Sequence, residues 1–561
     1  MNLKIKFSLY FFNLFLLSAL ILFDPRGSVI SEPYLQTLSS LSIAISYVSH
    51  DFKQFVGSKE VFNILSEIPS INNYSTRYIF FLSEYLTNFN NIDHVIDYKN
   101  IITQKINEAK NLPIVNPNDI HIYFGDLGFI IFIILAFSIF GVSLNSVSFL
   151  FLSLIIISSL FIMINFAKNN ILFFILQTIL FSFILIIIGN YGGSTQIFSL
   201  TNYRFISIIS LIPVLHLSFI FFEKEKISFN KIIFYFFQIL ILTFLCFVRG
   251  TSATGVIFLM IFYLVFAIFL ILQKKIDKQN ILRITLILLT FLSLFKTGDF
   301  LLNKNASDYY NSNVTLKKHP FWHSAFISSA FYPTIHEKFV CSDEKIKDIF
   351  EVKNTKCGSY PLLFKDKPNI IKNVIYYQPR DIFGYSAAIK YLKENGIKEN
   401  LGVESKLSIE LNLNWTKYEK TLKKIYFQVL NENTFDYLYI HLVIKPLKLV
   451  YEFIKFPVYF FYSFKINLIF LFFIQLLSAC SLVYVFKKVN LKEDFETLKK
   501  DKKHIVFFLS LLIMFLVYCL PSLVFYASPV SALPELMVVS FSVLIMSFKF
   551  RVNKLVFWTK N

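Results

Sequence analysis

Two long apolar runs joined by a short polar turn decide the fold. Residues 146–188 read SVSFLFLSLIIISSLFIMINF, then AKNN, then ILFFILQTILFSFILIII. The runs contain 21 and 18 residues, and about 20 apolar residues in a helix span the hydrocarbon core of a bilayer. Lys168 in the turn marks a cytoplasmic end, because short cytoplasmic loops are enriched in Lys and Arg. The stretch therefore predicts two consecutive membrane-spanning helices.

Eight further apolar runs extend this pattern over the chain. Hydrophobic residues make up 55% of the 561 residues and charged residues only 16%, whereas soluble proteins carry about 25% charged residues. These features exclude a soluble, disordered, collagenous or coiled-coil protein and predict an all-α polytopic membrane protein with about ten transmembrane helices. The further runs are Ile5–Phe23, Phe205–Phe222, Ile232–Val248, Val256–Leu272, Ile281–Phe295, Ile466–Phe486, Ile505–Tyr526 and Leu533–Phe548.

The distribution of basic residues decides the topology. A shorter apolar stretch, Leu127–Gly141, contains 15 residues. If it crossed the membrane, the Lys-rich segments Glu223–Lys231 and Lys274–Lys278 would lie outside. If it lies in the outer interface, every basic cluster beside a short loop becomes cytoplasmic, and only Arg204 and Arg249 remain in short outer loops. We therefore expect a multi-pass protein of the cell membrane with both termini cytoplasmic and an outer-face interfacial helix. The membrane-flanking clusters account for the net charge of +19, so no nucleic-acid partner is expected.

This topology divides the chain into three parts. Residues 1–296 form a transmembrane module whose first outer loop, residues 24–145, is long. Residues 297–465 form a small outer domain of mixed pattern, and residues 466–561 form the C-terminal transmembrane helices. Near the end of the outer domain, Leu438–Phe464 is aromatic and carries widely spaced lysines. This segment predicts an amphipathic helix lying on the membrane surface.

Three acidic residues are candidates for catalysis on the outer face. Asp24 directly follows the first apolar run and precedes Pro25, Glu32 lies shortly after it, and Asp126 precedes the interfacial helix. A carboxylate at the lipid–water boundary can accept a proton from an acceptor hydroxyl or hold a divalent cation. The alternative at Asp126 is an ordinary helix N-cap or a charge favourable to the helix dipole. No Cys-x-x-Cys or His-Glu-x-x-His spacing indicates a zinc site, so the metal stays unknown.

Arg204 and Arg249 are the candidate phosphate-binding residues. Each is the only Lys or Arg in its short outer loop, on the face where such residues are disfavoured. A guanidinium grips phosphate through two parallel hydrogen bonds and keeps its charge. It can therefore stabilise the charge that develops on a departing phosphate. The alternatives are an arginine that extends to the lipid headgroups and an internal ion pair.

A polar and aromatic segment opens the outer domain: residues 317–323 read KKHPFWH. His319 and His323 can exchange protons near neutral pH, Lys317 can contact an anion, and Trp322 can stack on a sugar or a cation. We expect Lys317, His319 and His323 to contact the substrate. The alternative is a surface turn with a packed Trp322.

Two cysteines lie outside the apolar runs, Cys341 and Cys357, 16 positions apart. On an oxidising outer face they are expected to form a disulfide, which would stabilise the domain by roughly 3 kcal/mol. Two reduced thiols are the alternative. A histidine inside an apolar run, His216, is interpreted as hydrogen-bonded to a neighbouring helix rather than as a functional group.

The order of these parts resembles the GT-C class of polytopic membrane glycosyltransferases. The resemblance covers roughly residues 1–300 in layout. One span is followed by a long outer loop, by the segment Phe129–Ser146, FIIFIILAFSIFGVSLNS, and by alternating spans, with Asn202-Tyr203-Arg204 after the third. Where many of those enzymes carry paired acids and a His-Pro-Pro element, this chain has Asp24 alone and Gly125-Asp126-Leu127-Gly128. The resemblance implies a polyprenyl-phosphate-linked sugar donor and an acceptor on the outer face.

The first functional hypothesis is therefore an integral-membrane glycosyltransferase whose partners are membrane lipids, a lipid-linked sugar donor and an outer glycan or protein acceptor. An O-antigen-type polymerase or ligase also combines outer-loop arginines with many spans, but the long loop after the first span favours the first hypothesis. A transporter or flippase of lipid-linked glycans predicts ionisable residues at mid-bilayer depth. A non-catalytic membrane protein predicts that Asp24, Arg204 and Arg249 lie apart.

Overall fold

Long apolar helices form most of the structure, which is a computed structural model of the chain. It describes residues 1–23, 30, 34–52, 54–68, 92–113, 115–116, 119–121, 127–188, 203–219, 229–273, 278–305, 321–340, 381–397, 415–450, 468–500, 503–524 and 533–558. Seven of the described helices are long and apolar enough to cross a bilayer, which indicates a multi-pass membrane protein. They are α1 (Leu3–Phe23), α8 (Leu144–Phe166), α9 (Asn170–Ile188), α12 (Phe229–Val248), α13 (Ala253–Leu272), α14 (Lys278–Asn305) and α28 (Lys503–Val524).

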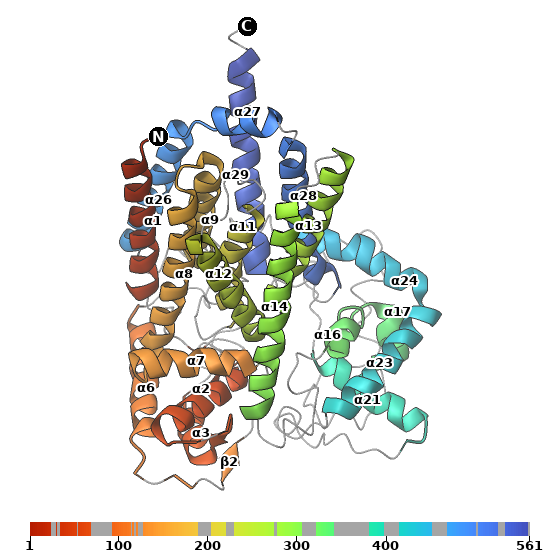
Figure 1. The fold of residues 1–561 in the computed structure, drawn as a ribbon. Helices are drawn as coiled ribbons and strands as arrows, with labels where there is room; N and C mark the ends of the chain where they lie inside the picture. The colour runs from red at the N-terminus through yellow and green to blue at the C-terminus, as the bar shows by residue number, and fades with distance from the viewer. Residues whose placement is uncertain are drawn as a thin grey trace.

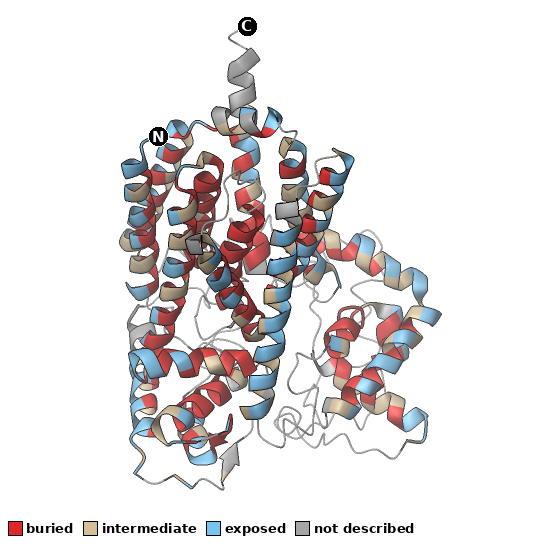
Figure 2. Cartoon of the chain, in the orientation of Figure 1, coloured by how far each residue is buried: buried red, intermediate tan, exposed pale blue. Residues whose placement is uncertain are grey.

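These helices stand side by side in one bundle (Figure 1). Helix α9 is its centre and packs against α1, α26 (Leu468–Lys488) and α29 (Leu533–Trp558). Figure 2 shows that α9 is buried along most of its length, whereas α14 is largely exposed. A shorter helix, α11 (Leu211–Phe219), continues the 3-10 turn η3 (Ser207–Ser210) and is fully buried. Exposed leucines and phenylalanines on the peripheral helices are the expected surface of a bundle in lipid.

The turn between α8 and α9 is held by two charged side chains from distant segments. Lys6 of α1 is buried and donates a hydrogen bond to the carbonyl of Ala167 at 2.7 Å. Asp494 of α27 (Lys492–Lys500) accepts from the backbone N–H groups of Asn170 at 2.7 Å and Ile171 at 3.3 Å. Lys6 thus lies at the C-terminal end of α8, which carries a partial negative charge, and Asp494 lies at the N-terminal end of α9, which carries a partial positive charge. This end of the bundle also carries both termini (Figure 1).

Helix α7 (Leu127–Phe140) runs across the other end of the bundle instead of along it (Figure 1). It packs against α2 (Tyr34–Ser49), α8 and α12. At Gly141 the backbone adopts a φ of +86°, and its N–H bonds to the carbonyl of Phe137. This left-handed glycine ends the helix. The crosswise direction agrees with the charge pattern, which excludes the stretch from the spanning helices.

The described part of the segment between α1 and α7 packs against α7 as a small helical layer. Besides α2 it contains α3 (Lys59–Ser66) and α6 (Ile92–Lys110). Two short strands, β1 (Gly57–Ser58) and β2 (Ile120–His121), pair antiparallel with Gly57 opposite His121. Gly57 is required there, because an added Cβ would lie 2.7 Å from the hydroxyl of Ser42.

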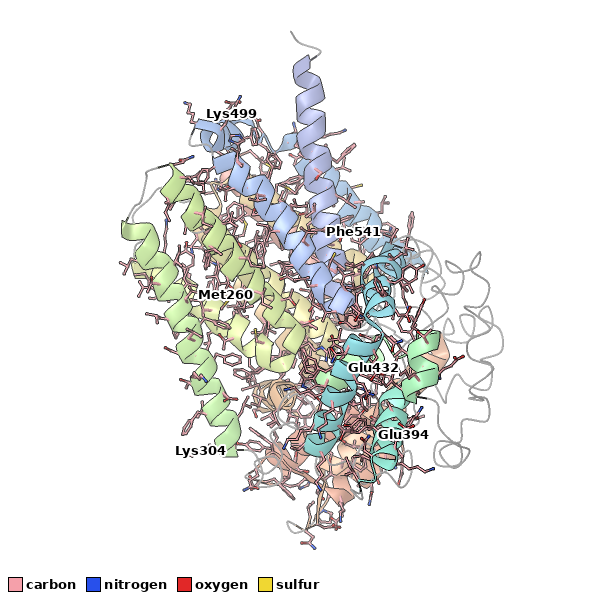
Figure 3. All side chains as sticks on the ribbon, turned by 90° about the vertical axis from the view of Figure 1, so that its right-hand side faces the viewer. Met260, Lys304, Glu394, Glu432, Lys499 and Phe541 are labelled. Carbon is pink, nitrogen blue, oxygen red and sulfur yellow. The ribbon has the colours of Figure 1, made fainter. Side chains whose placement is uncertain are left out.

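Residues 321–444 contain a second hydrophobic core beside the bundle (Figure 1). Its described elements are all helical, whereas the sequence predicts a mixed domain. They are α16 (Phe321–Ile327), α17 (Pro333–Ile335), the π-helix η7 (His336–Val340), α21 (Asp381–Glu394), α23 (Trp415–Glu432), α24 (Thr434–Tyr439) and the π-helix η9 (Ile440–Ile444). Glu394 of this domain lies toward the same end of the molecule as Lys304, away from Lys499, whereas Glu432 lies nearer the middle (Figure 3).

Candidate functional site

Arg249 lies at the C-terminal end of α12, at the end of the bundle that carries α7. Its N–H continues the helix through a 2.9 Å bond to the carbonyl of Leu245, and its backbone then turns to an extended conformation. Only 3% of Arg249 is exposed. An arginine that extended to the lipid headgroups would be accessible, so the structure excludes that alternative. A buried guanidinium is costly unless other groups compensate its charge.

The compensating carboxylate belongs to Glu535, in the first turn of α29. Glu535 is 1% exposed, and its carboxylate accepts a hydrogen bond from the hydroxyl of Thr251 at 3.2 Å. It also accepts a hydrogen bond from the hydroxyl of Ser207 and attracts the charge of Arg249. Three segments far apart in sequence therefore meet around one buried pair of opposite charges.

Tyr518 of α28 completes this group, which we call the rim cluster: Ser207, Arg249, Thr251, Tyr518 and Glu535. The tyrosine is 1% exposed and lies in the electrostatic field of Glu535. Helices α11, α13 and α28 approach closely at this level. A Cβ added to Gly255 would lie 3.0 Å from the Tyr518 hydroxyl and 2.6 Å from Cγ2 of Val214. Glycine is therefore needed to bring the tyrosine to the cluster.

Several polar atoms in this region are buried and make no hydrogen bond within the part of the chain that the structure describes. They are the hydroxyls of Ser210, Ser252, Tyr518 and Ser522 and the Oε2 atom of Glu535. Buried polar groups in proteins are nearly always hydrogen-bonded. Similar atoms also lie on α1, α9 and α26, so these atoms support a site for water or a polar ligand only together with the buried charges beside them.

An apolar pocket lies next to the rim cluster, further into the bundle, and four of the helices that line it also carry or adjoin cluster residues. It is lined by Leu211 and Val214 of α11, Phe258 of α13, Met514 of α28 and Val538 of α29, among others. Each of these residues lies three to seven positions from Ser207, Thr251, Tyr518 or Glu535 of the rim cluster, so the pocket follows the cluster along the same helix faces. Charged and polar groups at the helix ends and apolar side chains beneath them match an amphipathic molecule.

Of the site residues predicted from sequence, the structure describes the side chains of only Arg249 and His323. Arg249 is placed in the rim cluster. Arg204 lies in the short helix α10 (Tyr203–Ile206), three positions before Ser207, and only its backbone is described. The remaining candidates lie outside the described residues, namely Asp24, Glu32, Asp126, Lys317, His319, Cys341 and Cys357.

His323 takes part in a helix junction within residues 321–444. Its Nδ1 atom lies 2.5 Å from the hydroxyl of Tyr418, and both side chains are buried. The carboxylate of Glu419 accepts hydrogen bonds from the N–H groups of Trp322 at 2.9 Å and His323 at 2.8 Å, which caps α16. Burial raises the pKa of Glu419. These contacts make His323 and Trp322 packing and capping partners at the start of a helix, whereas the alternative for this segment is a surface turn with a packed Trp322.

His216 is also accounted for by neighbouring helices. Nε2 of Gln238 donates to its Nδ1 atom at 2.8 Å, and Asn165 lies 3.1 Å from its Nε2 atom. The amide of Gln238 is fixed because its oxygen accepts from the hydroxyl of Ser158 at 2.6 Å. The interpretation as an interhelical hydrogen-bonding residue therefore agrees with the structure.

Glu535 is the main residue that sequence reasoning missed. It stands inside the apolar run Leu533–Phe548, two positions from its start, where a carboxylate is disfavoured by lipid. That unusual position is the signal that could have identified it. The described residues contain no group of three or more His, Cys, Asp or Glu able to hold a metal ion. No protein-family model, curated protein or solved structure matches the chain, so its own geometry is the basis for interpreting the site.

Proposed function

We propose that the protein is an integral-membrane glycosyltransferase that moves a sugar from a polyprenyl-phosphate donor to an acceptor at the α7 end of the bundle. The observation that supports this most directly is the position of Arg249, buried beside Glu535 above an apolar pocket. A fixed guanidinium suits the phosphate, and the apolar side chains beneath the cluster suit the first part of an isoprenoid chain. The geometry therefore favours an anionic head joined to a hydrocarbon tail.

In this proposal Arg249 binds the departing phosphate. The bond between the sugar and the phosphate oxygen breaks, a bond to the acceptor oxygen forms, and negative charge grows on the phosphate. A positive charge held in a low-dielectric site stabilises that transition state more than the ground state. Arg204 is proposed as a second phosphate ligand, since its helix leads directly into Ser207 of the rim cluster.

The proton released by the acceptor goes to a carboxylate. Glu535 is one candidate, because it already lies beside Arg249. Asp126 is the other candidate. It lies two positions before Gly128 in the sequence, and Gly128 packs against the backbone of Phe247 and Val248, which directly precede Arg249. Asp24 and Glu32 remain further candidates. The proposed topology has ten spans and cytoplasmic termini, which places the rim cluster on the outer face.

The test compares a polyprenyl phosphate with the corresponding uncharged polyprenol as ligands of the full-length protein in detergent. We expect the phosphate to raise the melting temperature and the alcohol to have a much smaller effect. Arg249→Lys should weaken phosphate binding at least about tenfold, because a lysine cannot form the two-pronged contact. Lys304→Gln is the control, since it removes a positive charge at the same end of the bundle (Figure 3). Equal responses to phosphate and alcohol, or unchanged binding by Arg249→Lys, would contradict the proposal.

A further inference from the structure

The helical segment 434–450 has its apolar face on the outside and its lysines on the inside. It consists of α24, η9 and a continuing turn up to Val450. Phe435 is 88% exposed and Leu442 is 71% exposed, whereas Lys445 and Lys448 are buried. This arrangement is the reverse of an amphipathic helix whose lysines face water. The apolar face therefore has a solvent other than water, or a partner.

A continuous apolar stripe runs along this face: Phe435, Leu438, Leu442, Leu447 and Val450, all exposed. Three of the four steps are three or four positions long, as on any helix face. The step from Leu442 to Leu447 is five positions long, and it follows the π-helix Ile440–Ile444, whose wider turn absorbs one extra residue. Pro446 lies in this step and lacks an N–H, which also favours a local change of helix geometry. The stripe extends over about 22 Å at 1.5 Å per residue.

The buried lysines attach the segment to the end of α28. Nζ of Lys445 donates hydrogen bonds to the carbonyls of Leu523 at 2.9 Å and Val524 at 3.2 Å. These are the terminal carbonyls of α28, where a cation is favoured. The hydroxyl of Ser328 in the outer domain also donates to Val524 at 3.2 Å. The segment is therefore fixed to a membrane-spanning helix and to the outer domain at the same point.

The segment is joined to a helix that has its own exposed apolar surface. Leu512, Leu516 and Leu520 form an exposed row along α28, at intervals of four positions, that leads to this junction. We propose that the stripe of segment 434–450 is immersed in the lipid leaflet at the α7 end of the bundle and anchors the outer domain to the membrane surface. A lipid leaflet fits better than a protein partner, because Lys445 joins the segment to the end of α28, and the exposed leucine row of that helix is the surface expected to meet lipid. This inference does not depend on the proposed enzymatic activity.

The test places a tryptophan on the stripe of the full-length protein. Leu442→Trp is reconstituted in vesicles of phosphatidylcholine with brominated acyl chains, and its fluorescence is compared with that of the parent protein, which has three Trp. We expect the added tryptophan to lose on the order of half of its intensity, since apolar faces of such helices lie about 5–10 Å below the headgroups. Glu394→Trp, on the exposed end of α21, is the matched control and should respond to aqueous iodide instead.

Each other result would overturn the proposal. Quenching of Leu442→Trp by iodide would show that the stripe lies in water. Protection from both quenchers would show that a second protein surface covers it. If Leu442→Trp fails to fold, Leu447→Trp tests the same stripe one turn further along, with the same expected response.

Discussion

The carboxylate of Glu535 accepts a hydrogen bond from the hydroxyl of Thr251 at 3.2 Å, although 284 positions separate the two residues. This contact joins the first turn of the last helix to the turn that follows α12. Arg249 stands two positions before Thr251 and is attracted by the same carboxylate. The position of the proposed phosphate ligand therefore depends on the last helix of the chain.

This dependence predicts strong coupling between Arg249 and Glu535. Glu535→Gln or Arg249→Met should each destabilise the bundle by about 3 kcal/mol, because each leaves an opposite charge buried without its compensation. The double variant should cost less than the sum by at least about 1 kcal/mol. Equilibrium unfolding of the three variants in mixed micelles measures this difference. Strictly additive costs would show that the two charges do not interact.

A second prediction concerns the approach of α7 to α12. A Cβ added to Gly128 would lie 2.2 Å from the carbonyl carbon of Phe247 and 2.5 Å from the nitrogen of Val248. Backbone atoms cannot move aside as a flexible side chain can, so Gly128→Ala must separate the two helices. We expect a loss of several kcal/mol, in the upper range of single substitutions, and a reduced yield of monodisperse protein on size exclusion.

The matched control for this change is Gly250→Ala. An added Cβ at Gly250 meets no atom within 4 Å, and the residue directly follows Arg249. Its variant should keep the yield and melting temperature of the parent protein. Equal behaviour of the two alanine variants would show that the contact between α7 and α12 is looser than the structure indicates.

Much of the bundle follows from periodicity and charge alone. Apolar runs of about 20 residues require helices because a lipid core cannot satisfy free backbone groups. Segment Leu127–Phe140 is too short and lacks the flanking charges of a span, and it runs crosswise. Arg249 was identifiable because a single arginine in a short outer loop is unusual.

Interactions between distant helices could not be predicted in the same way. Periodicity does not show which helix ends meet, so the contact of Glu535 with Thr251 and its attraction to Arg249 are visible only in the three-dimensional structure. The lysines of segment 434–450 illustrate the same limit. Their spacing indicates an amphipathic helix with exposed lysines, but Lys445 is buried because it donates a hydrogen bond to a terminal carbonyl of α28. In the same way, the sequence does not show that His323 contacts Tyr418 through its side chain and Glu419 through its N–H, since both partners lie on another helix, α23.

The cap on α16 gives a third prediction. The carboxylate of Glu419 accepts from the backbone N–H groups of Trp322 and His323, and an alanine side chain can accept neither bond. Glu419→Ala should therefore destabilise α16 by about 1–2 kcal/mol. Hydrogen exchange at the amides of Trp322 and His323 should accelerate accordingly. Thr421→Val, on the same helix, removes a hydroxyl whose hydrogen bond among the described residues goes to the carbonyl of Lys417. It should leave these amides protected; acceleration by both variants would point to loosening of all of α23.

The pH dependence of the same cap has a defined sign. Burial raises the pKa of Glu419 above its usual value of 4.5 in the folded state. The contribution of this group to stability is therefore complete below pH 4.5 and is lost as the pH rises through the folded-state pKa. Protection of α16 in the parent protein should fall over that interval, and Glu419→Gln should remove the slope. An unchanged slope in the variant would assign it to another group.

The junction between segment 434–450 and α28 predicts the opposite sign. Nδ1 of His441 donates to the carbonyl of Leu523 at 2.8 Å, with Lys445 3.0 Å away. Burial, and then the charge of Lys445, lower the pKa of His441 from 6.5 to about 3. An undocked segment would take up a proton below pH 6.5, whereas the docked segment would not. The stability from this group is thus complete above pH 6.5 and is lost as the pH falls towards 3.

Docking should therefore weaken by up to about 1.4 kcal/mol for each pH unit within this interval. Hydrogen exchange of residues 440–450, corrected for the intrinsic effect of pH, measures this loss. His441→Gln keeps a donor for Leu523 but cannot be protonated, so its protection should stay level from pH 6.5 down to pH 4. A His441→Gln variant that weakens with acid as steeply as the parent would show that another group controls the junction. A parent protein without any slope would show that His441 is accessible to water and titrates normally in the docked state.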